Sequence, residues 1–154
     1  FDAQLSIAVD MKMPVFLHER DASEDFGEIL ARHRADLVGG VVHCFTGNAA
    51  ALERWLAMDM HIGITGWICD ERRGQELQTL VSRVPLDRLL IETDAPWLLP
   101  RDLRPRPPKG RNEPSFLPHI CQAIALHAGH SAEEVASAST ENARRLFGLA
   151  EPQD

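Results

Sequence analysis

Residues Leu89–Pro100 read LLIETDAPWLLP, and this stretch decides how the rest of the chain is interpreted. Its first residues are apolar enough for a buried strand, but two carboxylates, Glu92 and Asp94, stand where the strand must end, and Pro96 prevents it from continuing. A carboxylate that is buried without a partner costs several kcal/mol. The remainder of the sequence should therefore supply hydrogen-bond donors, a cation or further metal ligands that meet these two side chains.

Composition sets the class of protein. With 154 residues, 44% of them hydrophobic and 25% charged, the chain fits one globular unit with a sizeable core. It has no apolar run of the roughly 20 residues that span a bilayer and nothing resembling a signal peptide, so we expect a cytoplasmic protein without a membrane partner. The net charge of −7 argues against a protein that coats nucleic acid by bulk electrostatics, but it leaves room for a local basic patch.

The cysteines point to a reducing compartment. Cys44, Cys69 and Cys121 are widely spaced and form no CxxC pair. This pattern excludes a disulfide scaffold or a cysteine-rich zinc site, and it predicts reduced thiols that serve as packing residues.

Apolar runs and helix-like segments alternate along the chain. Because parallel strands covered by helices read as nearly continuous apolar runs, the alternation predicts an α/β protein built of consecutive βα units. Asp21 and Glu24 have the spacing of a capping box at the start of the second helix. The predicted strands lie within 14–18, 38–45, 61–68 and 88–95, and the predicted helices within 1–12, 22–33, 49–58 and 74–84.

A proline- and arginine-rich loop, RDLRPRPPKGRNEP (101–114), follows the fourth run and is too long to be a mere connector. Its cations suit either a solvated surface loop or a track for phosphates, and the sequence favours neither. Two or three helices should then close the chain, one opening at Pro114 and Ser115, one capped by Ser131 with Glu134, and a last one over 140–149. The cations are Arg101, Arg104, Arg106, Lys109 and Arg111.

Polar residues occur where the apolar runs end. In a parallel sheet the carboxyl ends of all strands meet at one edge, so His18, His43 and Asp94 should converge there. Two imidazoles and a carboxylate are ligands that divalent metals accept, although spacing alone leaves a metal site and a packing role equally supported. Strand alternation places Glu92 on the face of Asp94, where it could orient a neighbouring ligand, and Trp67 lies just beyond a strand end and could line a cleft. The other histidines are expected to be ordinary: His33, His61, His119, His127 and His130.

Four ordered motifs resemble the successive signatures of the TatD family of metal-dependent hydrolases, several of which are deoxyribonucleases. They are PVFLHERDASED, HCFTG, GITGW and IETDAP followed by RNEP, and the likeness runs from Phe1 to about Leu149. The resemblance implies a (β/α)₈ TIM barrel with one or two divalent metal ions (Mg²⁺, Mn²⁺ or Zn²⁺) at the carboxyl-terminal mouth.

The same resemblance assigns roles to single residues. It implies that His18 and His43 bind metal, that Asp94 binds metal and acts as base toward the attacking water, and that Glu92 assists catalysis or orients a ligand. It further implies that Arg20, Asn112 and Glu113 shape the mouth or its loops and contact substrate. Arg111, from the basic loop, is a further candidate for substrate contact.

The chain departs from the family pattern at its beginning. The family starts with an HxH pair and carries a metal-bridging glutamate in a GExGLD-like segment, and neither occurs in these 154 residues. A full barrel needs about 250 residues. We therefore expect residues 1–154 to be the second half of one TatD-like domain, four βα units plus terminal helices, whose open sheet edges would make it associate or pack loosely without the missing half.

For the intact protein the resemblance implies hydrolysis of DNA phosphodiester bonds, exonucleolytic and at single-stranded ends, with this chain alone inactive. Two alternatives stay open. One is a related metal-dependent esterase with another substrate, such as a D-aminoacyl-tRNA deacylase, and the other is a non-catalytic truncated half-barrel.

Overall fold

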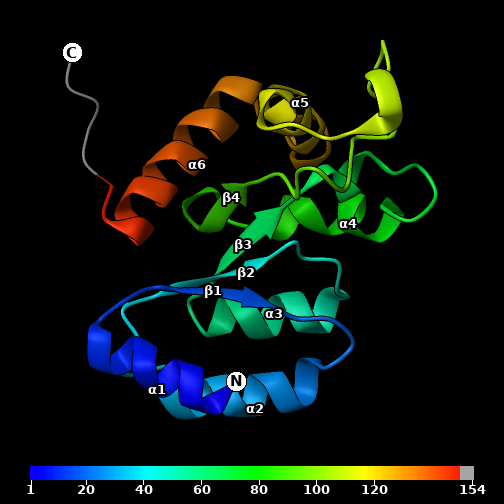
Figure 1. Ribbon diagram of the computed structural model, residues 1–154. Helices are drawn as coiled ribbons and strands as arrows, with labels where there is room; N and C mark the ends of the chain where they lie inside the picture. The colour runs from blue at the N-terminus through cyan, green and yellow to red at the C-terminus, as the bar shows by residue number, and fades with distance from the viewer. Residues whose placement is uncertain (150–154) are drawn as a thin grey trace.

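The computed structural model describes residues 1–149 and contains a four-stranded parallel sheet (Figure 1). The strands are β1 (Val15–His18), β2 (Gly40–His43), β3 (His61–Ile64) and β4 (Leu89–Ile91), and they follow one another across the sheet in chain order. Each lies within one of the predicted apolar runs. The predicted α/β class with four successive βα units is thus confirmed.

Helices connect the strands and extend beyond the last one. α1, α2 and α3 lie on one side of β1 and β2, whereas α5 and α6 lie at the β4 end of the sheet (Figure 1). Within residues 1–149, none of the helices combines the length and the apolar character that crossing a membrane requires. The α-helices are α1 (Asp2–Met11), α2 (Ser23–His33), α3 (Ala49–Ala57), α4 (Gln75–Leu80), α5 (Leu117–Ala128) and α6 (Ala132–Phe147), and the 3₁₀ turns are η1 (Gly66–Cys69), η2 (Val81–Arg83), η3 (Leu86–Arg88), η4 (Pro108–Gly110) and η5 (Pro114–Phe116).

The two faces of the sheet are covered unequally. Val15 and Leu17 of β1 belong to the core that the sheet forms with the helices, as do Ile62 and Ile64 of β3. The side chains of β1 that alternate with them point the other way, and there Phe16 is 59% exposed and His18 is exposed as well. β1 and β4 are the two outer strands of this sheet. The face that carries His18 is therefore open at the β1 edge.

Two helix starts test the capping predictions. Ser131 and Glu134 form the predicted capping box of α6, with each side chain accepting from the backbone N–H of the other residue. The capping box predicted for Asp21 and Glu24 is wrong. Asp21 adopts a left-handed conformation, and α2 follows Ala22 without a side-chain cap, while Glu19 Oε1 accepts from the Ala22 N–H at 2.8 Å.

The carboxyl-terminal helices also differ from the prediction. A separate helix over 140–149 is wrong, because α6 runs without a break from Ala132 to Phe147. Two polar residues in its middle, Ser139 and Asn142, face the sheet. Ser139 Oγ accepts from the Ile91 N–H at 2.9 Å, and Asn142 Nδ2 donates to the carbonyls of Leu86 and Leu89. These bonds satisfy the backbone of β4, which lies at the edge of the sheet.

A buried aspartate organises the turn between β3 and α4. Asp70 is only 2% exposed, and its Oδ1 accepts from the backbone N–H groups of Arg72 and Arg73 while Oδ2 accepts from the Arg73 guanidinium at 2.8 Å. Burial alone would raise the pKa of Asp70, but these donors outweigh it and lower the pKa from 3.8 to about 2. The Arg101 guanidinium lies 3.6 Å from Asp70 Oδ1, which links the turn to the long loop.

We predict that Asp70→Asn destabilises the full-length protein in a pH-dependent way. Here the full-length protein means the natural protein that contains this chain. Because the folded-state pKa is lowered, the stability from the carboxylate is present above about pH 4 and is lost as the pH falls toward about 2. The difference in Tm between the wild type and the variant should be largest near neutrality and vanish in acid. Asp36→Asn, an exposed carboxylate, is the control. An Asp70→Asn penalty that is equal at every pH would contradict this account.

Candidate active site

The carboxyl ends of β1 and β2 bring two histidines together. His18 and His43 are direct partners in the parallel register of the two strands, and their ring centroids lie 5.7 Å apart. A metal ion about 2.1 Å from one nitrogen of each ring would place the centroids at most about 6.5 Å apart. The observed separation lies within that limit.

Glu92, one residue beyond β4, reaches across β3 to the end of β2. Its Oε2 lies 2.8 Å from His43 Nδ1, and its Oε1 accepts from the Cys44 backbone N–H at 2.6 Å. The side chain crosses directly over Gly63 of β3. A Cβ added at Gly63 would lie 2.7 Å from Glu92 Cδ and overlap Oε1, so the crossing requires glycine at this position.

Asp94 meets the opposite side of the same imidazole. Its Oδ1 lies 3.2 Å from His43 Nε2, so His43 bridges the two carboxylates of the LLIETDAP stretch. The hydrogen bond to Glu92 raises the pKa of His43 above its ordinary 6.5, with both carboxylate charges adding to the effect against the opposing desolvation. Glu92 thus fixes Nδ1 and leaves Nε2 directed toward Asp94, which is how a carboxylate orients a metal-binding histidine.

Cys44 has a role at this site that composition did not suggest. It follows β2 in a left-handed conformation with φ of 48°, which turns its N–H toward Glu92. A residue other than glycine in this region costs on the order of 1 kcal/mol, and the bond to a carboxylate offsets that cost. Its buried sulfur lies 3.4 Å from Thr65 Oγ1. The prediction that Cys44 is a reduced packing residue describes its side chain but omits its backbone.

The donor set fits a divalent metal ion. Potential ligand atoms of His43, Cys44 and Asp94 all lie within 4.8 Å of one another. His18 is outside that tight group but faces it from the neighbouring strand, at the open β1 edge. Imidazole nitrogen and carboxylate oxygen suit borderline divalent ions such as Zn²⁺ or Mn²⁺. The predicted ligands His43 and Asp94 are thus brought together, with His18 one strand away.

Comparison with known proteins identifies the family. Residues 1–148 match the family model described as "TatD related DNase". The chain belongs to this family. It is 60% identical over 149 residues to the 3′–5′ ssDNA/RNA exonuclease TatD of Erwinia amylovora and 59% identical to that of Erwinia tasmaniensis, in each case covering 97% of this chain and 58% of the relative.

A solved structure agrees with this assignment. The TatD homologue YJJV of Escherichia coli superposes with a TM-score of 0.86 at 29% identity, over 97% of this chain and 55% of that protein. The chain thus spans little more than half the length of these TatD proteins, as predicted for part of a barrel.

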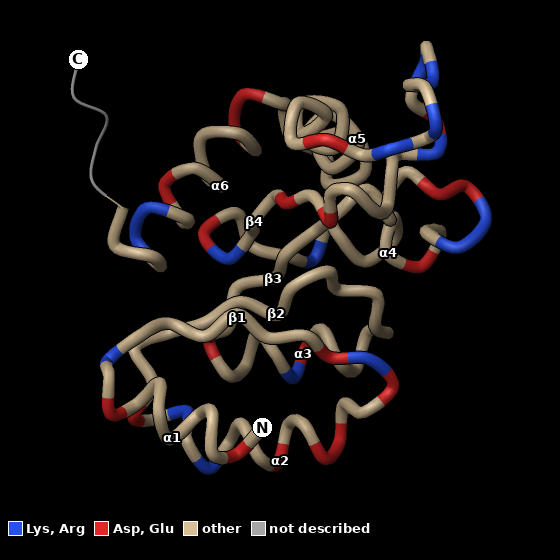
Figure 2. Tube along the Cα trace, in the orientation of Figure 1, with Lys and Arg blue, Asp and Glu red and all other residues tan. Residues whose placement is uncertain are grey.

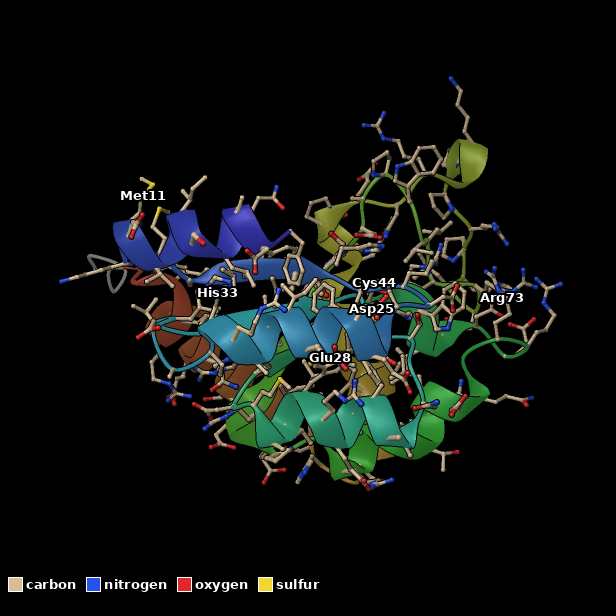
Figure 3. All side chains as sticks on the ribbon, turned by 90° about the horizontal axis from the view of Figure 1, so that it is seen from below. Met11, Asp25, Glu28, His33, Cys44 and Arg73 are labelled. Carbon is tan, nitrogen blue, oxygen red and sulfur yellow. The ribbon has the colours of Figure 1, made fainter. Side chains whose placement is uncertain are left out.

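The predicted rim residues of this TatD chain take different positions. Asn112 is buried, and its amide donates to the carbonyls of Trp97 and Leu98 and accepts from the Glu113 N–H, so it clamps the segment after Asp94. Trp67 is half-buried with the Arg73 guanidinium 4.3 Å above its ring. Figure 3 shows Arg73 at the periphery of the molecule and Cys44 in its interior. The remaining three are exposed: Arg20, Arg111 and Glu113.

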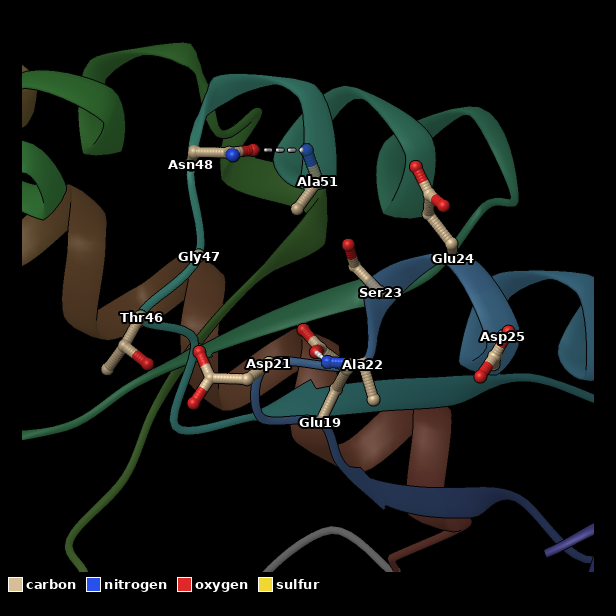
Figure 4. Close-up of a pocket in the computed structure, with 10 residues that line it drawn as sticks. All are labelled: Glu19, Asp21, Ala22, Ser23, Glu24, Asp25, Thr46, Gly47, Asn48 and Ala51. Carbon is tan, nitrogen blue, oxygen red and sulfur yellow. Dashed lines mark hydrogen bonds between the residues drawn. The ribbon is translucent and has the colours of Figure 1, made fainter.

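A cavity lies beside the strand ends rather than at the histidine and carboxylate groups. It measures about 620 Å³ between the loops that follow β1 and β2 (Figure 4). Its wall includes Glu19, Asp21, Glu24 and Asp25, and Asn48 caps α3 at its edge by accepting from the Ala51 N–H. Four carboxylates repel a polyanion, so this cavity is not suited to a nucleic-acid strand.

We predict that Gly63→Ala lowers metal affinity of the full-length protein about 10–100-fold, the usual range when the residue that orients a ligand is lost. The new methyl group displaces Glu92, and His43 loses its partner at Nδ1. Metal content and a titration with Mn²⁺ or Zn²⁺ measure the effect.

The matched control for this variant is Gly129→Ala at the end of α5. Its left-handed φ of 78° makes that substitution costly for stability, but the added Cβ meets nothing within 4 Å. Gly129→Ala should therefore lower Tm and leave metal affinity unchanged. Equal metal affinity in Gly63→Ala and the wild type would show that Glu92 does not orient His43.

Proposed function

We propose that the full-length protein is a metal-dependent nuclease that removes nucleotides from single-stranded ends of DNA, and of RNA as the names of its relatives suggest. The observation that carries the proposal is His43 held between Glu92 and Asp94, with His18 facing it across the strand ends. Its family and its identity to exonucleases support the same reaction.

In this proposal His18, His43 and Asp94 hold one or two divalent ions, Mg²⁺, Mn²⁺ or Zn²⁺. Such an ion lowers the pKa of a bound water and stabilises charge on the scissile phosphate. Glu92 fixes the His43 ring through Nδ1, so that Nε2 faces the mouth. Asp94 lies at the open end of the group, where a carboxylate oxygen can accept the proton of the attacking water.

The chain would supply the carboxyl-terminal portion of one barrel, and the other portion would complete the site. Its superposition on 55% of the YJJV chain and the open inner face of β1 support this arrangement. We also propose a cytosolic location, which the three free cysteines support.

The loop between β4 and α5 is the proposed path of the nucleic-acid strand. Blue segments mark its cations in Figure 2. Two of them are engaged within the protein: Arg101 forms a two-pronged ion pair with Glu71, and Arg104 donates to backbone carbonyls. Among residues 1–149, no carboxylate lies within ion-pair distance of the remaining cations. Trp97, three residues after Asp94, is 74% exposed and could stack on a base. These cations are Arg106, Lys109 and Arg111.

We predict that Asp94→Asn in the full-length enzyme lowers kcat at least ~10²-fold, the typical loss of a general base, while the fold survives. Asparagine keeps the shape and a carbonyl oxygen but loses the charge and basicity. Glu92→Gln should cost less, because Glu92 acts through His43. The assay is turnover of a single-stranded oligonucleotide with saturating Mg²⁺ or Mn²⁺, beside metal content and circular dichroism.

Near-full turnover by Asp94→Asn would remove Asp94 from the chemistry. An aminoacyl-tRNA hydrolysed faster than the oligonucleotide by the wild type would reassign the substrate and leave the metal site intact.

We predict that replacing Arg106, Lys109 and Arg111 together by Gln raises KM and leaves kcat within about twofold. Each lost phosphate contact reduces the slope of log affinity against log salt by about 0.7 for a single strand, so the slope should fall by about 2. The control removes as many cations elsewhere, as Arg32, Arg83 and Arg144 to Gln. If the control changes the salt slope as much as the loop variant, the loop is not the strand's path.

A further inference from the structure

Three side chains of metal-ligand type meet outside the site described above. Cys69 ends η1, Asp102 lies in the loop after β4, and His119 stands in the first turn of α5. One ligand atom of each lies within 4.8 Å of the other two, and His119 Nε2 is 2.7 Å from Asp102 Oδ1. Segments far apart in the sequence thus bring a thiol, a carboxylate and an imidazole to one point.

The dimensions suit a tetrahedral ion. Sulfur at about 2.3 Å and nitrogen or oxygen at about 2.1 Å from one Zn²⁺ lie roughly 3.5 Å from each other. The three atoms would reach this geometry with shifts of about 1 Å, which exposed Asp102 and half-buried His119 can make. The mixed sulfur, nitrogen and oxygen set favours Zn²⁺ over Mg²⁺, which prefers oxygen ligands.

The surroundings leave room for a fourth ligand. A cavity of about 270 Å³ adjoins the three side chains, and Gln122 and His127 also line it. One of these side chains could occupy the fourth position. Structural zinc sites take four protein ligands, so His127, which lines this cavity, would have to complete the set.

A simpler account is an ion pair between His119 and Asp102 with a thiol packed beside it. That account treats Cys69, 5% exposed, as a thiol that donates a hydrogen bond to Asp102, whereas a bound ion would use all three side chains as ligands. Burial, together with the Asp102 carboxylate, raises the pKa of the Cys69 thiol to about 12. A bound ion therefore has to displace the proton.

We propose that Cys69, Asp102 and His119 form a zinc site that fastens the loop after β4 to η1 and α5. The ion would be separate from the metal ions of the His43 and Asp94 group. Its place in the fold gives it a structural task, because it would join the loop that carries Arg106, Lys109 and Arg111 to the body of the protein. The site does not depend on the proposed nuclease activity.

Cobalt substitution of the full-length protein tests the assignment. Co²⁺ bound to a thiolate gives a near-ultraviolet charge-transfer band that Co²⁺ bound only by nitrogen and oxygen lacks. The wild type should show this band, and Cys69→Ser should lose it together with one equivalent of bound metal. His119→Gln and Asp102→Asn, which keep the thiol, should weaken Co²⁺ binding at least about tenfold.

The other two buried cysteines provide matched controls. Cys121→Ser and Cys44→Ser should keep the band, and the second control also separates this site from the His43 and Asp94 group. Circular dichroism verifies that each variant folds. A band that disappears in Cys44→Ser and persists in Cys69→Ser would overturn the proposal, as would the absence of any band in the wild type.

Limited proteolysis tests the structural task. Trypsin cleaves after Arg and Lys except where proline follows, and the loop offers exposed Lys109 and Arg111, which precede Gly110 and Asn112. Zn²⁺ should slow cleavage in this loop several-fold in the wild type and have no effect in Cys69→Ser. Equal protection of both proteins by Zn²⁺ would show that the ion acts elsewhere.

Discussion

The contact between Glu92 and His43 is the constraint on which the site depends. A carboxylate at the end of a buried strand needs donors, and Glu92 obtains them from the ring of His43, the last residue of β2, and from the N–H of Cys44, which follows it. This single side chain therefore ties the end of β4 to the end of β2 across β3. It fixes the rotation of the His43 ring, and through that ring the position of the atom that faces Asp94.

Much of this was predictable because it follows from periodicity. Apolar runs and helix-like segments gave the order of the elements, and a parallel sheet necessarily carries His18, His43 and Asp94 to one edge. What periodicity could not show was contact across strands. The sequence placed Glu92 on the right face, but it did not indicate that Gly63 leaves the space for it or that Cys44 turns its backbone toward it. Those contacts depend on how neighbouring strands align with one another in the sheet. The pattern of residues along a single strand does not reveal that alignment.

The errors share a physical cause. Asp21 and Glu24 have capping-box spacing, but Asp21 adopts a left-handed conformation and α2 begins without a side-chain cap. The helix expected over 140–149 is the continuation of α6, whose Ser139 and Asn142 hydrogen-bond to the backbone of β4. In the same way His119, expected to be ordinary, faces a cysteine and an aspartate from distant segments. Local rules assign a polar residue to its own element, and tertiary partners can override that assignment.

The crossing of Glu92 over Gly63 also limits how this site can change over evolutionary time. Gly63 has no unusual backbone conformation that would demand glycine, so the restriction at this position comes from Glu92 alone. The two positions are therefore epistatic: a side chain that enters at 63 displaces Glu92 from His43, and a glutamate at 92 reaches His43 only when glycine stands at 63. Loss of either residue removes the contact that the other serves, so the pair should be inherited as a unit.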